Sequence, residues 1–302
     1  MISRVLVIGG AGFIGSHIVD LLQKEGLPVR VFDSFESGSK DNLPDGIDLV
    51  IGDIRDAGAV KEAMRGVSHV VHLAALVSVP LSVAEPKLTH DINTEGTRTV
   101  LAAARDAGIQ GVVLASSAAV YGDDPEMPKR EYMPAKPLSP YAVSKLENER
   151  DALKSTEDGI PVIALRFFNV YGPRQKGNHP YASAVARFKE AAESGAPVQI
   201  FGDGSQTRDF VHVKDVARAI RAALDAPHAA GGVFNIASGT TVSLNDVLSY
   251  IEEARAAAIE RIYLPERAGD LKDSSADITR AKHALGYAPQ VSVKEGIIEL
   301  FS

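Results

Sequence analysis

Residues 5–16 of the chain, VLVIGGAGFIGS, decide the expected fold. Four apolar residues are followed by a turn in which Gly9, Gly12 and Gly15 have the spacing G-x-x-G-x-x-G, and a helical pattern begins there. Glycine permits such a tight turn and lets backbone N–H groups approach a pyrophosphate at the positive end of the helix. Because the motif lies between a strand and a helix, it predicts the start of a dinucleotide-binding sheet.

The same alternation continues through the first half of the chain. The predicted strands are residues 5–8, 29–32, 49–51, 70–73, 112–115 and 162–167, and the predicted helices are residues 16–25, 57–64, 94–107 and 141–154. Apolar strands that alternate with helices are typical of a parallel sheet covered on both faces. With right-handed crossovers, the sequence predicts an α/β fold with a doubly wound (Rossmann) sheet over residues 1–168.

Beyond residue 168 the alternation is lost, and we expect a smaller C-terminal α/β substrate lobe over residues 169–302. Its predicted elements are a loop at 171–181, a helix near 183–193, a strand at 198–201, a polar turn at 202–208, a helix at 215–224, a strand at 233–236 and, from 243 on, two helical patterns around a strand at 262–264. No linker separates the lobes, so residues 209–236 are expected to return to the first domain. The last helical pattern, 294–301, leaves open whether native residues follow Ser302.

Composition narrows the class of protein. The chain has 302 residues, of which 45% are hydrophobic and 24% charged, as in ordinary globular proteins of about two domains. The net charge of −7 argues against nucleic acid or an anionic membrane as a partner. The absence of cysteine excludes disulfides, thiolate catalysis and cysteine metal sites, and we expect no metal. No apolar run approaches about 18 residues, so we expect a cytoplasmic protein.

The ends of the predicted strands supply the rest of a cofactor site. Asp33 ends the second strand, where a carboxylate accepts hydrogen bonds from the adenosine ribose and repels a 2′-phosphate, so NAD is favoured over NADP. An ordinary residue at the start of a loop is the alternative for Asp33. Asp53, with Ile54, is placed to contact adenine, although Asp53 could instead cap a helix. The expected cofactor residues are Gly9, Gly12, Phe13, Ile14, Asp33, Asp53, Ile54, Leu73, Ala74, Ala75, Tyr141 and Lys145.

Three of these residues come from the segment His72-Leu73-Ala74-Ala75, which closes the fourth strand where the dinucleotide should pass. The small alanines leave room for a cofactor. His72 is interpreted as structural.

Tyr141 and Lys145 form Tyr-x-x-x-Lys at the head of a predicted helix, after Pro140. The spacing places both side chains on one helix face. A free tyrosine has a pKa near ~10. A nearby ammonium and a positive nicotinamide would favour the phenolate and let it act as a base, and the lysine can also hold the nicotinamide ribose.

Ser117, at the end of a predicted strand, would donate to the substrate oxygen that becomes a carbonyl, with Ser116 as its substitute. A surface Tyr–Lys pair is the competing interpretation.

The segments GGAGFIGS, DIRD, HLAA, SSAAVYG, SPYAVSK, RFFNVYGPR and DGSQTRDFVHVKDVA together resemble the extended short-chain dehydrogenase/reductase family. Within it they are most similar to UDP-glucose/UDP-galactose 4-epimerases and their N-acetylhexosamine relatives. The resemblance spans essentially the whole chain. It implies that Tyr141 takes the proton of the sugar 4-hydroxyl while the C4 hydride passes to NAD⁺. The 4-keto sugar then turns in the site and receives the hydride on its other face.

The residues after Ser117 separate this reaction from its relatives. Dehydratases of the family carry an Asp-Glu pair and UDP-glucuronate decarboxylases a Glu, whereas this chain has Ala118 and Ala119, which transfer no proton. The GDP-fucose synthase type uses a cysteine, which is absent. Many galactose epimerases have a threonine at position 119, so one supporting hydrogen bond to the substrate would be missing here, although alanine is also familiar in the family.

The resemblance also implies a nucleotide-sugar site. It assigns Asn169 to the sugar diphosphate, although a turn residue before Gly-Pro is the alternative. Arg208 and Arg267 suit a diphosphate because guanidinium groups match its oxygens in forked geometry, although either could form a surface salt bridge. The remaining candidates are Gln199 and Phe201 for uracil, Asp270 for the uridine ribose, and Ser78 and Ser117 for the sugar.

Ser274 aligns with the family position that gates the space around the sugar C2 substituent. A small residue there predicts that UDP-GlcNAc and UDP-GalNAc are substrates beside UDP-glucose and UDP-galactose. Competing hypotheses are a UDP-uronate 4-epimerase, a net dehydrogenase or reductase, and a non-catalytic NAD sensor. Relatives commonly form homodimers through two helices, here residues 94–107 and 141–154, but these helices could equally pack within one subunit.

Overall fold

The computed structural model describes residues 2–177, 183–266 and 272–302. Seven strands form one parallel sheet in the order β11-β6-β5-β4-β1-β2-β3. Their bounds are β1 Val5–Ile8, β2 Val29–Asp33, β3 Asp48–Ile51, β4 His69–His72, β5 Gly111–Ser117, β6 Val162–Phe167 and β11 Val233–Ile236. The strand order reverses between β1 and β4, which is the switch point where ligands bind in doubly wound sheets. The predicted Rossmann sheet is confirmed.

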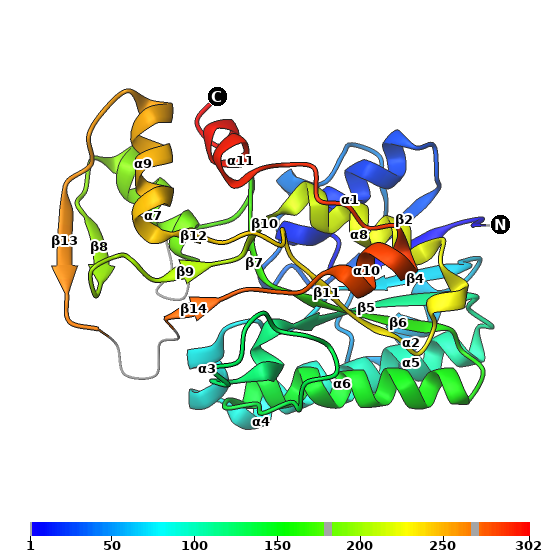
Figure 1. Cartoon of the computed structure of the whole chain (residues 1–302). Helices are drawn as coiled ribbons and strands as arrows, with labels where there is room; N and C mark the ends of the chain where they lie inside the picture. Colours follow the sequence, from blue (N-terminus) through cyan, green and yellow to red (C-terminus); the bar gives the residue numbers. More distant parts are fainter. Residues whose placement is uncertain (1, 178–182, 267–271) are drawn as a thin grey trace.

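Helices cover both faces of this sheet (Figure 1). One face carries α1 (Phe13–Lys24), α8 (Val213–Leu224) and α10 (Thr279–Leu285), and the other carries α2 (Ala57–Ala63), α5 (Gly96–Asp106) and α6 (Pro140–Glu157). A π-helical turn, Asp91–Glu95, leads into α5, and a 3₁₀ turn, Ala118–Tyr121, follows β5. Because β1 and β6 lie inside the sheet and are covered on both sides, all four residues of β1 and all six of β6 are buried.

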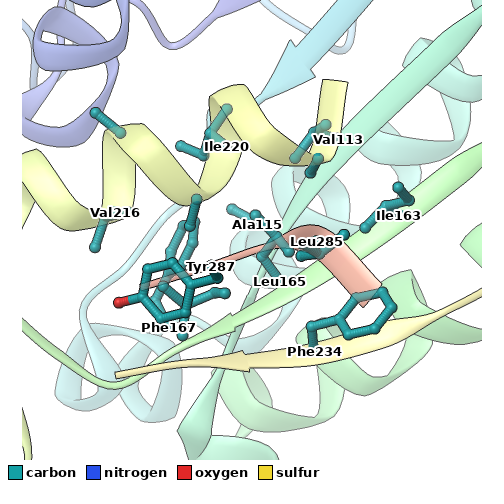
Figure 2. Close-up of a cluster of buried hydrophobic side chains, with 14 of the residues drawn as sticks. Val113, Ala115, Ile163, Leu165, Phe167, Val216, Ile220, Phe234, Leu285 and Tyr287 are labelled. Atoms are coloured by element: carbon teal, nitrogen blue, oxygen red, sulfur yellow. The ribbon is translucent and has the colours of Figure 1, made fainter. Parts of the chain in front are cut away.

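The larger hydrophobic core lies between the sheet and α8. In Figure 2, Val216 and Ile220 of α8 lie over the side chains of β5 and β6, and Phe234 and Tyr287 lie near the edge formed by β11. Tyr287 also donates a hydrogen bond to the Ala237 carbonyl at 2.8 Å, which ties the segment after α10 to the end of β11. The C-terminal part of the chain therefore completes the core of the first sheet.

A second group of elements lies beyond the carboxyl ends of the strands (Figure 1). It comprises β7 (Asn169–Tyr171), α7 (Ala184–Ser194), β8 (Val198–Phe201), β9 (Thr207–Arg208), β10 (Phe210–His212), β12 (Val242–Ser243), α9 (Leu244–Arg255), β13 (Arg261–Leu264), β14 (Asp273–Ser274) and α11 (Val293–Glu299). Its own core includes Phe188, Ile200 and Leu248. Among the described residues of this group the strands are short and occur in three small sheets, so these strands form no continuous layer.

Some elements differ from the prediction. Asn169 begins strand β7, which pairs with β10 through Asn169↔Phe210, and the predicted polar turn ends in strand β9. Two short helices, α3 (Val79–Ala84) and α4 (Pro86–His90), were not predicted, because a proline at the start of each resembles a helix breaker when it is in fact tolerated in the first turn. The tail holds three helices among its described residues, where two helical patterns were expected.

Across residues 2–177, 183–266 and 272–302, no helix has both the length and the apolar character needed to cross a bilayer.

Candidate active site

At two positions, Gly9 and Gly15, the glycine turn after β1 leaves no room for a side chain. Gly9 has φ +81°, and a Cβ there would lie 2.7 Å from the Ala74 backbone nitrogen. A Cβ on Gly15 would lie 2.0 Å from the Gly9 carbonyl oxygen, because the first turn of α1 packs directly on the loop. The turn therefore brings the backbone after β1 against the backbone after β4, at the switch point of the sheet.

Gly12 faces open space at the start of α1. A Cβ there would have only the Gly9 oxygen, at 3.3 Å, within 4 Å. Gly12 is also the N-cap, no side chain caps this helix end, and the first turn, which contains Phe13 and Ile14, has no acidic residue. An uncapped positive helix end beside open space fits the pyrophosphate of a dinucleotide. These residues are thus suited to hold NAD.

Asp33, at the end of β2, stabilises this turn by accepting hydrogen bonds. Its carboxylate is buried and accepts hydrogen bonds from the backbone N–H groups of Ala11 (2.9 Å) and Phe35 (2.8 Å). These two bonds occupy one lone pair on each oxygen, and each oxygen has a second. The remaining acceptor positions are compatible with the predicted ribose contact, which stays a prediction.

Asp53 and Ile54 lie beyond β3. Asp53 accepts hydrogen bonds from the Arg55 guanidinium, which lowers the pKa of its carboxyl, and Ile54 is buried in the second hydrophobic cluster. The alternative of a helix cap at Asp53 is wrong, because Asp56 caps α2 by accepting from Gly58 and Ala59. The adenine contact predicted for Asp53 and Ile54 stays a prediction.

The segment after β4 runs beside the glycine turn. The N–H groups of Leu73 and Ala74 both donate to the Ile8 carbonyl, and Leu73, Ala74 and Ala75 are half-buried. His72 is buried, its Nε2 lies 3.0 Å from Thr97 Oγ1, and burial lowers its pKa to about 3. A neutral histidine bonded to a threonine fits the structural interpretation.

Tyr141 and Lys145 project from the first turns of α6. Ser139 caps this helix by accepting from the Ala142 N–H at 3.2 Å, and Pro140 occupies its first position. Lys145 is buried, donates to the Ala115 carbonyl of β5 at 3.0 Å, and has its Nζ 5.9 Å from the Tyr141 ring centroid. The predicted Tyr–Lys pair is therefore turned toward the carboxyl end of β5.

Ser117 and Ser116 point to different partners. Ser117 is half-buried and shares a hydrogen bond with Tyr141, whereas Ser116 is buried and its Oγ donates to Glu149. Alternation along β5 separates the two side chains in this way. Of the two serines, Ser117 is the one beside the tyrosine.

The chain by itself does not lower the pKa of Tyr141. Burial raises it, and the hydrogen bond with Ser117 only partly offsets that rise. Burial also disfavours the charged form of Lys145 and lowers its pKa to about 8. The phenolate expected from the sequence thus cannot be attributed to the side chains of the chain alone.

A buried ion pair between Glu149 of α6 and Arg166 of β6 was not predicted from the sequence. The Arg166 guanidinium of β6 donates from Nε and Nη2 to the two oxygens of Glu149, at 2.8 and 2.7 Å. Although burial alone would lower the pKa of Arg166, the bonds to Glu149 raise it. The signal was present in the sequence, since Glu149 follows Lys145 by the same four-residue step that separates Lys145 from Tyr141.

Three of the predicted substrate residues meet near the ends of β7, β9 and β14. Asn169 Nδ2 donates to the Asp209 carbonyl at 2.9 Å, and Arg208 Nη1 donates to the Thr207 carbonyl at 2.7 Å. Ser274 is half-buried and pairs with Arg208 in the register of β14 and β9. One buried residue, Asp209, therefore lies next to both Asn169 and Arg208.

Asp209 was not predicted. Its carboxylate accepts from Ser238, Gly239 and, at 3.4 Å, the Ala276 N–H, and burial raises its pKa to about 6. It thereby joins β10 to the loop after β11 and to the segment after β14. No periodic pattern in the sequence marks such a residue.

The other predicted substrate residues are dispersed. Ser78 caps α3 by accepting from Leu81 at 3.1 Å. Gln199 is exposed on β8, and Phe201 is half-buried at the end of that strand. Arg267 and Asp270 lie outside the described residues. Among the residues that the structure describes, no group of three or more His, Asp or Glu is placed to hold a metal ion.

Comparison with known proteins agrees with this geometry. A family model described as the NAD dependent epimerase/dehydratase family matches residues 5–237. The UDP-glucose 4-epimerase of Mycolicibacterium smegmatis is 41% identical over 306 residues, which cover 97% of this chain and 96% of that protein. A less similar relative, the UDP-glucuronate 4-epimerase of Thermodesulfobacterium geofontis, is 31% identical over 316 residues, which cover 97% and 93%.

Solved structures match over nearly the full length. A UDP-N-acetylglucosamine 4-epimerase from Methanobrevibacter ruminantium, in complex with UDP-N-acetylmuramic acid, has a TM-score of 0.93 at 37% identity and covers 99% of this chain and 97% of its own. A UDP-glucose 4-epimerase of Thermus thermophilus, in complex with NAD, has a TM-score of 0.89 at 38% identity and covers 99% and 98%. The elements beyond the sheet therefore have counterparts in these epimerases.

Proposed function

The chain belongs to the NAD-dependent epimerase/dehydratase family, and we propose that it interconverts the C4 epimers of a UDP-hexose. The proposed substrates are UDP-glucose/UDP-galactose together with UDP-GlcNAc/UDP-GalNAc. The observation that carries the proposal is the group formed by Ser117, Tyr141 and Lys145 at the end of β5. No side chain able to eliminate water follows Ser117, since the next two residues are alanines.

In this proposal Tyr141 moves the proton. Its phenolic oxygen takes the proton of the sugar 4-hydroxyl as C4 is oxidised and returns it when C4 is reduced on the other face. When bound, NAD⁺ supplies the acceptor for the C4 hydride and the positive charge of its nicotinamide ring. Ser117, already bonded to the tyrosine, donates to the oxygen that becomes a carbonyl, where a positioned donor stabilises developing charge. Because the hydride is returned, no net oxidation results.

Two features support a nucleotide sugar as the substrate. Arg208 lies beside Asn169 and Ser274 in a lobe beyond the carboxyl edge of the sheet, where the switch point also brings the cofactor turn. A guanidinium suits a diphosphate. The half-buried serine at position 274 leaves more space than a bulky residue would, which supports turnover of the N-acetyl sugars.

The alternative within the family is a UDP-uronate 4-epimerase, which the relative from Thermodesulfobacterium geofontis favours. Incubation with UDP-glucose, UDP-GlcNAc and UDP-glucuronate, without added cofactor and with products resolved by NMR, separates the two proposals. We expect conversion of the first two. Conversion of UDP-glucuronate alone would support the alternative, turnover of UDP-glucose without UDP-GlcNAc would contradict the role of Ser274, and stoichiometric NADH formation would indicate a net dehydrogenase.

We further propose a homodimer through α5 and α6. Apolar side chains are exposed on α6, where Val143 is 41% and Leu153 50% exposed, and α5 packs beside α6. A second copy of the chain would cover them, since clustered apolar surface commonly marks an interface. Light scattering is expected to give twice the chain mass, and Val143→Asp is expected to shift it toward the monomer. The cytoplasmic location expected from the sequence stays a prediction.

A further inference from the structure

Three consecutive residues at the end of β5 bind three successive turns of α6. The Ala115 carbonyl accepts from Lys145 Nζ at 3.0 Å, the Ser116 hydroxyl donates to Glu149, and Ser117 bonds with Tyr141. The residues of α6 are spaced by four, so they lie along one face of the helix. The third member of this face, Glu149, has no part in the proton transfer proposed above.

Glu149 is held more firmly than either of its neighbours on that face. It is 6% exposed, and both of its oxygens are bound by Arg166, which is 5% exposed and lies opposite Ser116 in the register of β5 and β6. Arginine and carboxylate in this forked arrangement fix each other's position. A buried ion pair of this kind is weak evidence for a role in stability, because removing two charges from water is costly.

We propose that Glu149 is a positioning residue, whose carboxylate, fixed by Ser116 and Arg166, keeps the Lys145 ammonium charged beside Tyr141. This inference rests on the proposed function, since a charged Lys145 matters only if Tyr141 must ionise. The ammonium donates a hydrogen bond to the Ala115 carbonyl, which carries no net charge. A carboxylate one helical turn away supplies the missing negative charge.

The charges around Lys145 have opposite effects. On α6 it faces Tyr141 and Glu149, and the carboxylate raises its pKa against the lowering effect of burial. On β4 it faces His72, which is neutral near pH 7 because its pKa is lowered to about 3. On β6, behind Glu149, lies Arg166, whose guanidinium is also 4.7 Å from the ring centroid of Tyr121. β5 adds no charged side chain.

We therefore expect neutralisation of Glu149 and neutralisation of Arg166 to change the Lys145 pKa in opposite directions. Glu149→Gln leaves the Arg166 cation unbalanced and lowers the Lys145 pKa. Arg166→Gln leaves the carboxylate unbalanced and raises it. Each substitution is expected to shift the Lys145 pKa by about one unit, which is typical of the effect of a single nearby charge on a pKa. The double variant, with both charges removed, is expected to lie between the wild type and Glu149→Gln.

The test measures the Lys145 pKa directly. Holoenzyme labelled with ¹³C at lysine Cε is titrated by NMR without substrate, and the Lys145 signal is assigned by its loss in Lys145→Met. In parallel, the alkaline limb of kcat/KM is measured for each variant with UDP-glucose. If a single variant does not fold, the charge-neutral double variant still reports the direction of the shift.

We expect the Lys145 pKa and the alkaline limb to fall in Glu149→Gln and rise in Arg166→Gln. If the Lys145 pKa stays unchanged in both variants, or moves in the same direction in both, the inference is overturned and Glu149 has a purely structural role. This holds whether or not the variants retain epimerase activity. Opposed shifts of the lysine signal in an enzyme that converts no UDP-sugar would instead uphold the positioning of Lys145 and contradict the proposed function.

Discussion

Two regions at the same edge of the sheet are built by opposite means. The glycine turn after β1 depends on the absence of side chains, since a Cβ on Gly15 would lie 2.0 Å from the Gly9 oxygen. The face of α6 depends on the presence of side chains, since Tyr141, Lys145 and Glu149 each bind a residue of β5. The first region should therefore fail when atoms are added, and the second when functional groups are removed at constant shape.

The largest effect is expected for Gly15→Ala. The added methyl would overlap the turn, and overpacking of this kind costs about 3 kcal/mol or more because the backbone must move. We expect a lower Tm and loss of cofactor from the purified protein, measured by thermal unfolding and by absorbance of the released nucleotide. A variant with normal Tm and a full complement of NAD would show that the turn is not as tightly packed as its geometry indicates.

A smaller effect, on rate alone, is expected for Ser117→Ala. Removing a hydrogen-bond donor from a developing charge typically costs about 10²-fold in kcat. The matched control is Ser116→Ala, which loses the bond to Glu149 and not one to Tyr141, so its kcat should fall less. The kcat values of the two variants are compared by steady-state kinetics with UDP-glucose. Equal losses of kcat would contradict the assignment of Ser117, and not Ser116, as the donor to the substrate.

The smallest effect is expected for Gly12→Ala, which adds the same methyl group as Gly15→Ala within the same turn. Its backbone, φ −75° and ψ 179°, is open to alanine, and only the Gly9 oxygen is near. We expect an unchanged Tm and about tenfold weaker binding of NAD, equivalent to about 1.4 kcal/mol, because the added methyl would lie where the pyrophosphate is proposed to approach the helix end. Titration of cofactor-free protein with NAD measures this, and unaltered affinity would place the pyrophosphate elsewhere.

The sequence predicted the regular part of the molecule well. The strands β1, β6, β8 and β11 begin and end at the predicted residues, because each is a mainly apolar run bounded by turns or polar residues. The Tyr–Lys pair and Ser117 were predicted to be neighbours and lie together in the structure, because their positions follow from strand ends and helix spacing. Periodicity is sufficient for such features.

Features that depend on contacts between distant segments were not predictable. The pairing of Glu149 with Arg166 joins a helix to a strand, and Asp209 binds the loop after β11 and the segment after β14. Helical spacing places Glu149 on the same face as Lys145, but no pattern in the sequence indicates that Arg166 is its partner or marks Asp209. The pKa of Tyr141 was expected to be lowered by Lys145 together with the nicotinamide. In the chain alone burial raises it, and burial can be judged only once the surrounding elements are in place.

The Tyr141 hydroxyl is proposed to transfer the proton at C4 beside a bound NAD. Tyr141→Phe removes that oxygen and keeps the ring, so fold and cofactor content should be preserved. Loss of an acid–base group of this kind is expected to lower kcat by about 10²- to 10⁴-fold. The measurement is the NMR-detected interconversion of UDP-glucose and UDP-galactose by wild type and Tyr141→Phe at equal NAD occupancy. We expect near-complete loss of turnover in Tyr141→Phe, and turnover at the wild-type rate would rule out the role proposed for Tyr141.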